Sequence, residues 1–489
     1  MKLESPGGRD MVAADGIVRT EKKVRGNNVC ASKKTFSYSR KRMAIRLAAL
    51  LPLLRLSRAG AQEENNVGYR REIYRENDDR IKVNTDSFHL DFKLSDALRV
   101  KGEVVLDAIS GATPTGAPPQ TKWPFQTFNQ YAASAYQQAF ASQFGSYIQN
   151  NIIYADAGYI TYLQLTNDAT VFAQNSAPTI ATNSAIASYQ ALTNSPNYRN
   201  KHVPLTDIKD KRTAFSLQLP IAFGRHEISP SFSYSTESDY ISYGGALNYS
   251  LALNNKNTTL SAGWSHNSDR VRDDQFVWQD KTTDDGFLGV VQLLSPKSYI
   301  TFNASLGVER GYLADPYRGI MPAMNFPQLD PNDAALIPEK RPDHRSKEIA
   351  YLAFNQFVTP LNGAVEVSYR FFHDSYEIFA HTAQLTWHQK IGQQVIISPY
   401  LRYYQQSAAY FYYEMVPDYN NLPSSYSSDY RLSHFQSLGA GVDITWRVHK
   451  YVSLDAGYLR YDLEGLDGVT SQSAYPSANV FTVGLRVWF

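Results

Sequence analysis

Long stretches of this chain alternate between apolar and polar side chains. The clearest stretch ends the chain, where one parity holds Phe481, Val483, Leu485, Val487 and Phe489. Successive side chains of a β-strand point to opposite faces, so the pattern predicts a strand with one apolar and one polar face. Such strands suit the wall of a membrane barrel, which has lipid on one side and a polar interior on the other.

The same alternation predicts sixteen strands. Their approximate positions are 67–76, 82–94, 97–109, 209–222, 225–238, 240–254, 257–270, 284–295, 298–311, 346–358, 363–374, 377–389, 393–407, 430–447, 450–463 and 477–489. Strands of soluble sandwiches and propellers are usually about 5–6 residues long, and most of these are longer. The predicted fold class is therefore all-β, a transmembrane up-and-down antiparallel β-barrel of about 16 strands.

The links between the predicted strands alternate in length. Tight links such as Ser95-Asp96, Asn255-Lys256 and Pro296-Lys297 alternate with links that are mostly longer, at 110–208, 271–283, 312–345, 408–429 and 464–476. Short periplasmic turns and long outer loops are typical of bacterial outer-membrane barrels. We therefore expect both chain ends on the periplasmic side and closure of the barrel by pairing of strands 67–76 and 477–489. The apolar parity of the last strand is also the expected insertion signal.

The N-terminal residues resemble a leader. A basic stretch at residues 40–46 precedes an apolar run at residues 47–56 and the small residues Ala59-Gly60-Ala61. This order predicts a signal peptide at residues 43–61, with residues 1–42 as a basic extension or a mis-assigned start. A disordered basic tail before a short helix is the alternative. In the mature region, 62–489, no stretch approaches the roughly 20 apolar residues of a membrane helix, so strands must do any spanning.

The charge balance changes when the leader is set aside. Residues 1–61 hold 14 of the 48 basic and 4 of the 46 acidic residues, which leaves 34 basic and 42 acidic residues and a net charge of −8. The basic character therefore belongs to the leader, and nucleic acid is not expected as a partner. The single cysteine, Cys30, also precedes residue 62, so disulfides and thiolate chemistry are not expected in the mature chain.

Charged residues of both signs occupy the polar parity of the predicted strands. The candidate lumen charges are Asp91, Lys93, Arg99, Lys101, Glu103, Asp107, Glu309, Glu366, Arg370, Arg402, Asp443, Asp455 and Arg486. At bilayer depth such groups must face water or each other. They are either the walls of a hydrated path or salt-bridge ladders that stiffen the barrel.

The segment 110–208 is expected to form a long insertion. Residues 124–155 carry no charge, and Phe125, Phe128, Tyr147 and Ile148 lie at roughly helical spacing among many alanines. A helix folded into the lumen and a flexible outer loop are both compatible with this composition.

Catalytic and metal-binding patterns are sparse. His266 and Ser268 share the outward parity near the outer end of a strand, an arrangement reminiscent of outer-membrane phospholipases. His373 and His381 flank one turn without a third ligand at a convincing spacing, so no metal and no cofactor are expected. We expect that the protein is not an enzyme, with an outer-membrane lipid hydrolase acting through His266 and Ser268 as the alternative.

Four motifs in order resemble one protein family. They span residues 107–115, 369–376, 402–412 and 428–433, and they read DAISGATPT, YRFFHDSY, RYYQQSAAYFY and SDYRLS. The chain resembles domain-of-unknown-function family 3570, whose members are uncharacterised bacterial proteins regarded as outer-membrane barrels. The resemblance covers about residues 67–489 apart from much of 121–205, and it supplies no catalytic residues. It implies a Gram-negative outer-membrane location and suggests periplasmic redox or other envelope proteins as partners.

Within this resemblance two segments have expected roles. Gly111 and Pro114 should set a bend where the third strand leaves the membrane. The tyrosine-rich stretch 403–413 should continue its strand above the bilayer, where it either binds a ligand or caps the barrel rim.

These observations predict a porin-like channel for small hydrophilic solutes or ions, or the membrane scaffold of an envelope complex. A structural or partner-binding barrel with a blocked lumen is a further alternative. The expected partners are outer-membrane lipid and the barrel-insertion machinery.

Overall fold

A computed structural model describes residues 65–78, 80–118, 202–322, 336–416 and 421–489. The expected extension at 1–42, the signal peptide at 43–61 and most of the 110–208 insertion lie outside these residues. Among the described residues, no helix has the length and apolar character needed to cross a membrane.

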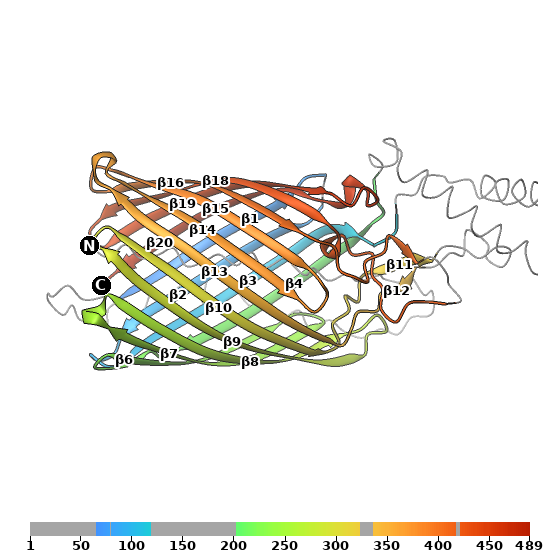
Figure 1. Cartoon of the computed structure of the whole chain (residues 1–489), viewed down its shortest axis with the longest axis horizontal. Coiled ribbons are helices and arrows are strands. Elements are labelled where there is room, and N and C mark those ends of the chain that lie inside the picture. Colours follow the sequence, from blue (N-terminus) through green and yellow to red (C-terminus); the bar gives the residue numbers. More distant parts are fainter. Residues whose placement is uncertain (1–64, 79, 119–201, 323–335, 417–420) are drawn as a thin grey trace, which may run out of the picture.

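Sixteen antiparallel strands form a closed barrel (Figure 1). They are β1 (Asn66–Glu76), β2 (Lys82–Lys93), β3 (Arg99–Pro114), β4 (Leu205–Gln218), β6 (His226–Thr236), β7 (Tyr240–Leu253), β8 (Thr258–Arg272), β9 (Trp278–Ser295), β10 (Ser298–Gly311), β13 (His344–Val358), β14 (Gly363–Asp374), β15 (Phe379–Ile391), β16 (Val395–Gln406), β18 (Phe435–His449), β19 (Val452–Gly465) and β20 (Ser477–Trp488). The predicted fold class and strand number are confirmed.

Shorter elements complete the fold. They are the strands β5 (Ile221–Phe223), β11 (Gly319–Pro322), β12 (Ile337–Pro338) and β17 (Met415–Val416), and the 3₁₀ turns η4 (Asn254–Lys256), η6 (Thr359–Leu361), η7 (Tyr430–Leu432) and η8 (Gln472–Ala474). β5 extends the β4 edge of the barrel, whereas β11 pairs with β12 and β17 in a small separate sheet.

The first and last strands close the barrel. β1 and β20 pair antiparallel along their whole length, from Asn66 opposite Trp488 to Glu76 opposite Ala478. Every other barrel strand pairs with its neighbours in the sequence, so the order is up-and-down throughout. The predicted closure is confirmed.

The two ends of the barrel differ. At one end, here called the turn end, links such as residues 296–297, 359–362 and 392–394 are short. Residues in the left-handed region, such as Gly224 and Asn362, make these reversals, because glycine and asparagine adopt positive φ at low cost. At the other end, here called the loop end, lie the links 237–239, 273–277, 375–378 and 466–476, together with the described residues of the links 77–81, 115–204, 312–343 and 407–434. Most of the long links therefore lie at one end, as predicted.

Several boundaries differ from the prediction. The link predicted at 271–283 is wrong, since β9 begins at Trp278 and leaves only a short turn after β8. β3 and β4 pair from Pro114 opposite Leu205 downward, so the insertion begins after residue 114 and ends before 205. The alternation failed at these places because the strands continue beyond the lipid-facing band, where both faces meet polar surroundings.

The outer face of the wall is apolar. Leu306, Leu288 and Val483 are 67%, 65% and 62% exposed, which marks them as side chains that contact lipid rather than a protein core. The residues between them in sequence point to the interior. This two-residue period is the one that a barrel between lipid and water requires.

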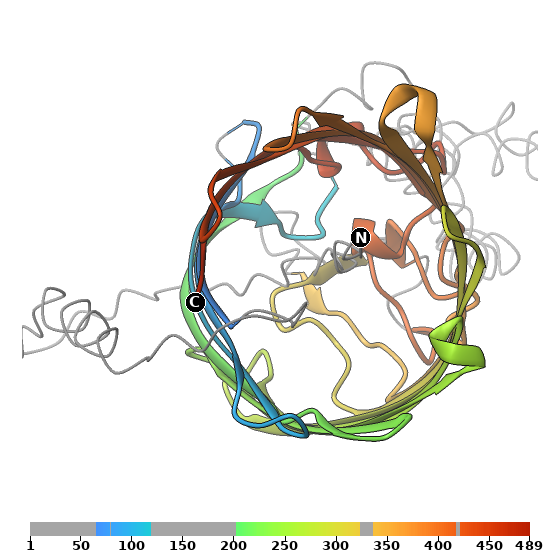
Figure 2. The ribbon, with the colours of Figure 1, turned by 90° about the vertical axis from the view of Figure 1, so that its left-hand side faces the viewer.

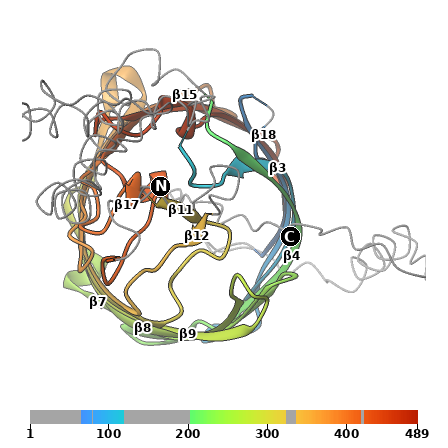
Figure 3. The same ribbon diagram turned by 90° about the vertical axis from the view of Figure 1, so that its right-hand side faces the viewer.

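The buried apolar clusters lie inside the loop end. One cluster joins Tyr376, Ile378, Phe411 and Leu432, and another joins Ile81, Ile109 and Ile208. Figure 3 shows β11, β12 and β17 across the opening that the ring of strands encloses, Figure 2 gives the opposite view, and Figure 1 places β11 and β12 at the loop end. The long loops therefore fold inward over the lumen and pack on one another.

The tyrosine-rich stretch belongs to this packing. β16 ends at Gln406, so the expected continuation of the strand through 413 is wrong. Phe411 is 1% exposed and contacts Tyr376 edge-on, and Tyr412 hydrogen-bonds Thr470 at 2.5 Å. The chain turns inward because its aromatic side chains find apolar partners within the mouth rather than above it.

The closing register predicts which cysteine pairs can cross-link. We expect Ile73→Cys with Phe481→Cys, which are directly opposite, to form a disulfide. Ile73→Cys with Val483→Cys is two residues out of register and is the matched control. Mass spectrometry of oxidised protein should find the cross-linked peptide only in the first variant. Equal cross-linking in both variants would contradict the register.

Candidate functional site

The inner wall carries the candidate lumen charges. On each strand their parity is opposite to that of the exposed apolar residues, such as Leu106 on β3, Leu401 on β16 and Leu485 on β20. The structure therefore places all thirteen residues on the inner face: Asp91, Lys93, Arg99, Lys101, Glu103, Asp107, Glu309, Glu366, Arg370, Arg402, Asp443, Asp455 and Arg486.

Several of these charges pair across neighbouring strands. Arg99 Nη2 lies 2.6 Å from Asp91 Oδ1, and Lys101 Nζ lies 3.9 Å from Asp91 Oδ2. Arg212, which the sequence reasoning missed, donates to Asp107 Oδ2 at 2.7 Å. The wall therefore combines local ion pairs with exposed charges such as Glu103, and it presents a mixed-charge polar surface to the lumen.

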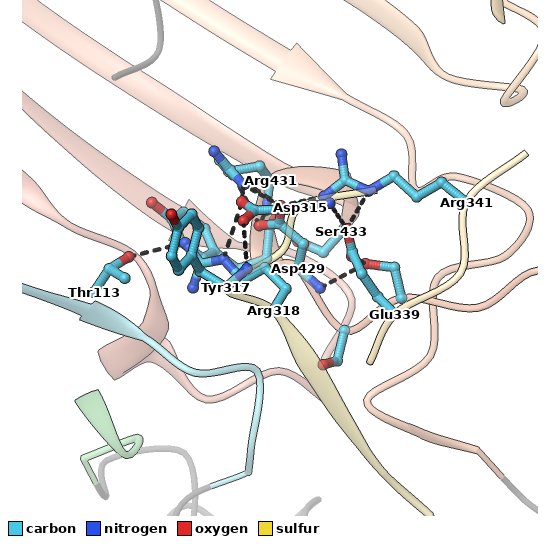
Figure 4. A network of polar contacts seen from close by, with 12 residues as sticks. Thr113, Asp315, Tyr317, Arg318, Glu339, Arg341, Asp429, Arg431 and Ser433 are labelled. Carbon is cyan, nitrogen blue, oxygen red and sulfur yellow. Dashed lines mark hydrogen bonds and ion pairs between the residues drawn. The ribbon is translucent and has the colours of Figure 1, made fainter. Parts of the chain in front are cut away.

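The loop end holds a second set of polar groups, which we call the cover network. It comprises Thr113, Asp315, Arg318, Glu339, Arg341, Asp429 and Arg431 (Figure 4). Thr113 lies at the end of β3, the next four residues lie in the 312–343 loop, and the last two lie in the 407–434 loop. These side chains join parts of the wall that are far apart around the barrel.

Arg431 and Asp429 form the centre of the cover network. Arg431 Nε lies 2.9 Å from Asp429 Oδ2, and Arg431 Nη2 lies 2.5 Å from Asp315 Oδ2. Asp429 is 1% exposed and also receives a hydrogen bond of 2.8 Å from Arg341 Nη2. One buried carboxylate thus holds two guanidinium groups from two loops.

The cover network extends on both sides. Arg341 Nε lies 2.7 Å from Glu339 Oε1, and the backbone N–H of Asp315 donates to the same oxygen at 2.5 Å. On the other side, Arg318 Nη2 donates to Thr113 Oγ1 at 2.8 Å. This last contact connects the loop assembly to the barrel wall.

Burial and charge act in opposite directions on these carboxyls. Burial raises the pKa of Asp429, but the guanidinium groups of Arg431, Arg318 and Arg341 outweigh it and hold that pKa well below its usual range. Burial raises the pKa of Glu339 above its usual value, because Arg341 only partly offsets it while Asp315 and Asp429 add to the rise. Asp429 is therefore the fixed anion of the network.

Packing around the cover network is tight. A cavity beside Arg318, Ser428 and Tyr430 measures only about 20 Å³, little more than a single water occupies. Gly116 has a positive φ, and a Cβ there would lie 2.1 Å from the carbonyl oxygen of Gly319. The start of the insertion is therefore pressed directly against the β11 segment.

An acidic cluster lies beside the cover network. The carboxylate oxygens of Asp210, Glu237 and Asp239 all lie within 4.8 Å of one another, and they are the described residues whose spacing could hold a cation. Burial, with the charges of Asp210 and Asp239 and against that of Arg212, raises the pKa of Glu237 to about 7. No local pattern predicts this group, because Asp210 lies on β4, whereas Glu237 and Asp239 lie in the turn after β6.

His266 and Ser268 lie on the outer face of β8, as predicted. The register places Asp284 opposite His266, and the two are joined by a hydrogen bond of 2.8 Å. Within the described residues, the hydroxyl of Ser268 makes no hydrogen bond. The geometry supplies a histidine–carboxylate pair at the lipid face without an activated nucleophile.

The four sequence motifs converge on the loop end. Thr113, Tyr376, Phe411 and Asp429 each come from a different motif, and all four are buried there. The expected bend at Gly111 is wrong, because β3 continues through Gly111, which has a positive φ, and ends at Pro114. The motifs thus mark the packed mouth, which alternation alone could not locate.

A comparison with protein-family models decides the family. The model described as "Protein of unknown function (DUF3570)" matches residues 47–277 and 271–480. The chain belongs to this family. Among curated proteins, no sequence matches that of the DUF3570 protein.

Solved structures similar to the DUF3570 protein include a siderophore receptor, an outer membrane secretin and a hydrocarbon channel. The siderophore receptor PirA from Pseudomonas aeruginosa is 9% identical with a TM-score of 0.38, and the match covers 87% of this chain and 62% of that one. A bacterial polysaccharide outer membrane secretin is 7% identical, with a TM-score of 0.39 and coverage of 88% and 100%. The CymD monoaromatic hydrocarbon channel is 9% identical, with a TM-score of 0.33 and coverage of 93% and 94%. The DUF3570 protein spans about three fifths of the length of PirA, and the likeness concerns the fold alone.

The cover network makes a prediction about stability. We expect Asp429→Asn to loosen the 312–343 and 407–434 loops by about 3–5 kcal/mol, because it leaves Arg341 and Arg431 buried beside a neutral group. Faster proteolysis within these loops, in detergent, should report the change. Asp274→Asn removes an exposed carboxylate from the same end and should leave the cleavage rate unchanged. Equal rates in both variants would show that the network does not hold the loops.

The raised pKa of Glu237 predicts that the stability of the 237–239 turn depends on pH. Its pKa in the folded protein, about 7, lies above the ordinary value of 4.5, so the folded turn binds the proton more tightly than the unfolded turn. Stability of the 237–239 turn should therefore fall as the pH rises from about 4.5 to 7 and then level off. Hydrogen exchange, corrected for intrinsic rates, should show better protection of this turn at pH 5.5 than at pH 8. Glu237→Gln should show equal protection at both values, and a wild type without any difference would refute the assignment.

Proposed function

We propose that this DUF3570 protein is a gated channel in the bacterial outer membrane for small hydrophilic solutes or ions. The observation that carries the proposal is the cover network, a set of buried ion pairs that joins inward-folded loops at one end of a polar-lined barrel. In this proposal the ion pairs of the cover network hold the loops in the closed position.

The membrane location is supported by the wall itself. The exposed apolar band, the long antiparallel strands and the pairing of β1 with β20 satisfy what a lipid environment demands of a spanning chain. The apolar outward face of β20, with Phe481, Val483 and Leu485 exposed, fits recognition by the barrel-insertion machinery. In this orientation the turn end faces the periplasm and the loop end faces outward.

The conduit is supported by the inner wall. Charges of both signs, among them Asp91, Arg99 and Glu103, line a barrel of the strand number that in porins encloses an aqueous channel. The mixture favours hydrophilic solutes without a strong preference for either sign of charge, because positive and negative groups alternate along the wall.

The gate is supported by the chemistry of the cover. Buried ion pairs contribute little net stability compared with well-packed apolar groups, but losing one partner is costly. A cover held by Asp429, Arg341 and Arg431 therefore has one closed arrangement. Breaking one of these ion pairs would release the loops.

A permanently blocked barrel is the second candidate. The tight packing beside Arg318 and Tyr430 favours it, since the described loops leave little space there. Such a barrel would act as a scaffold that binds envelope proteins. Neither candidate assigns a chemical reaction to the protein. The His266–Asp284 pair, with Arg310 3.8 Å from the same carboxylate, is taken as a polar contact of the outer interface.

Conductance in planar bilayers separates the two candidates. We expect wild-type protein to show rare, brief openings, and Arg431→Gln to raise the open probability about tenfold or more, because it breaks the contacts to Asp315 and Asp429. Arg310→Gln removes a guanidinium that is 59% exposed outside the network and should behave as wild type. Silent bilayers for all three proteins would refute the channel and leave the scaffold.

A further inference from the structure

A row of basic side chains crosses the outer face near the loop end. Arg75 on β1 lies opposite Lys82 on β2, Lys82 lies opposite Ser110 on β3, and Ser110 lies opposite Lys209 on β4. Residues directly opposite on neighbouring strands point to the same face. With strands about 4.8 Å apart, the row spans about 14 Å. Lys211 lies two residues along β4 on the same face.

These side chains point away from the lumen. Arg75 has the parity of Ile73, whose partner on β20 is the exposed Phe481, and Lys209 and Lys211 have the parity of the exposed Phe215. Arg75, Lys209 and Lys211 are themselves exposed. The basic row, defined as Arg75, Lys82, Lys209 and Lys211, therefore lies on the surface of the wall.

Most of the basic row has no carboxylate partner. Within the described part of the chain, the side chains of Arg75, Lys209 and Lys211 form no ion pair. The nearest acidic residues along the strands are accounted for, since Asp86 is bound by Arg71 at 3.3 Å and by Tyr69 at 2.6 Å, while Asp207 stands beside Lys209 toward the solvent. The described acidic residues beside the row are Asp207 and the exposed Asp78 in the turn between β1 and β2, so the four cations remain in excess.

An apolar surface lies below the basic row, and the ion pair between Arg71 and Asp86 lies between the two on the same face. Phe481, Leu106, Phe88 and Phe215 are 47%, 43%, 40% and 41% exposed on the same sector of the wall. Nine residues separate Arg75 from Asn66 at the turn end, which corresponds to about 30 Å along a strand and about 21–25 Å along the membrane normal at the usual tilt. The basic row therefore lies at the upper edge of an apolar band about 25 Å tall.

We propose that the basic row binds the sugar-linked phosphates of the phosphorylated glycolipid, lipid A, that forms the outer leaflet of the bacterial outer membrane. Its acyl chains would lie on the apolar sector below. The inference rests on the outer-membrane location given under the proposed function, but not on whether the barrel conducts.

The chemistry fits a ligand with more than one phosphate. The Arg75 guanidinium can hold one phosphate through two parallel N–H donors, and the lysine ammonium groups act as point charges for a second. Cations spread over about 14 Å exceed the reach of a single phosphate group. A phospholipid with one phosphate would engage only part of the basic row.

Binding can be measured by native mass spectrometry of full-length protein in detergent with added bisphosphorylated lipid A. We expect the variant Arg75→Gln/Lys82→Gln/Lys209→Gln/Lys211→Gln to bind at least tenfold more weakly than wild type. The control Arg225→Gln/Lys256→Gln/Lys297→Gln/Lys450→Gln removes the same charge from the turn end and should bind as wild type. Monophosphoryl lipid A and phosphatidylglycerol should bind wild type more weakly than lipid A, and added salt should weaken all binding.

Two results would overturn the proposal: equal lipid A binding by the two four-fold variants, or equal binding of phosphatidylglycerol and lipid A by wild type. If the four-fold variant does not fold, Lys209→Gln/Lys211→Gln should still lower the affinity several-fold, and an unchanged affinity there would count equally against it. Bilayer conductance of the same preparations keeps the tests apart, because loss of glycolipid binding with normal gating contradicts this inference alone.

Discussion

The need to satisfy every backbone hydrogen bond in lipid governs this structure. A strand at the edge of an open sheet would expose a row of N–H and C=O groups to hydrocarbon at a cost of several kcal/mol each. The pairing of β1 with β20 removes both edges at once. The even strand number, the antiparallel order and the shared location of the short turns are all consequences of closing a sheet in this way.

Closure also separates the lipid outside the barrel from the polar interior, and the two environments favour different side chains. Outside, residues such as Leu306 and Val483 stay exposed because lipid replaces the core that a soluble protein would need. Inside, the wall is polar, and the only buried apolar clusters among the described residues form where loops fold into the mouth. The cover network lies among these clusters, where low polarity strengthens each ion pair and makes an unpaired charge costly.

The sequence predicted the wall well and the mouth poorly. Alternation is a local property, so strands such as 298–311 and 363–374 could be placed from their own residues. The contacts of Asp429 with Arg341 and Arg431, or of Glu237 with Asp210, depend on how distant loops meet, and no local period encodes that. The motif at residues 428–433 contains Asp429 and Arg431, but it did not indicate their role, because Arg341 and Asp315, with which they pair, lie in the 312–343 loop. The basic row was missed for the same reason, because Arg75 and Lys209 are neighbours only across a register that spans β1 to β4.

The seam between β1 and β20 has a consequence for biogenesis. Asn66 pairs with Trp488, so the first barrel strand cannot find its permanent neighbour until the last one has been made and delivered. Until then two open edges persist on a chain whose outward residues are apolar, which is the condition under which strands join wrong partners. A closure of such long sequence separation is also slow to form by chance, because the loop to be closed contains nearly the whole described chain. The time between the synthesis of β1 and its pairing with β20 is therefore the interval in which this protein is most vulnerable to misfolding.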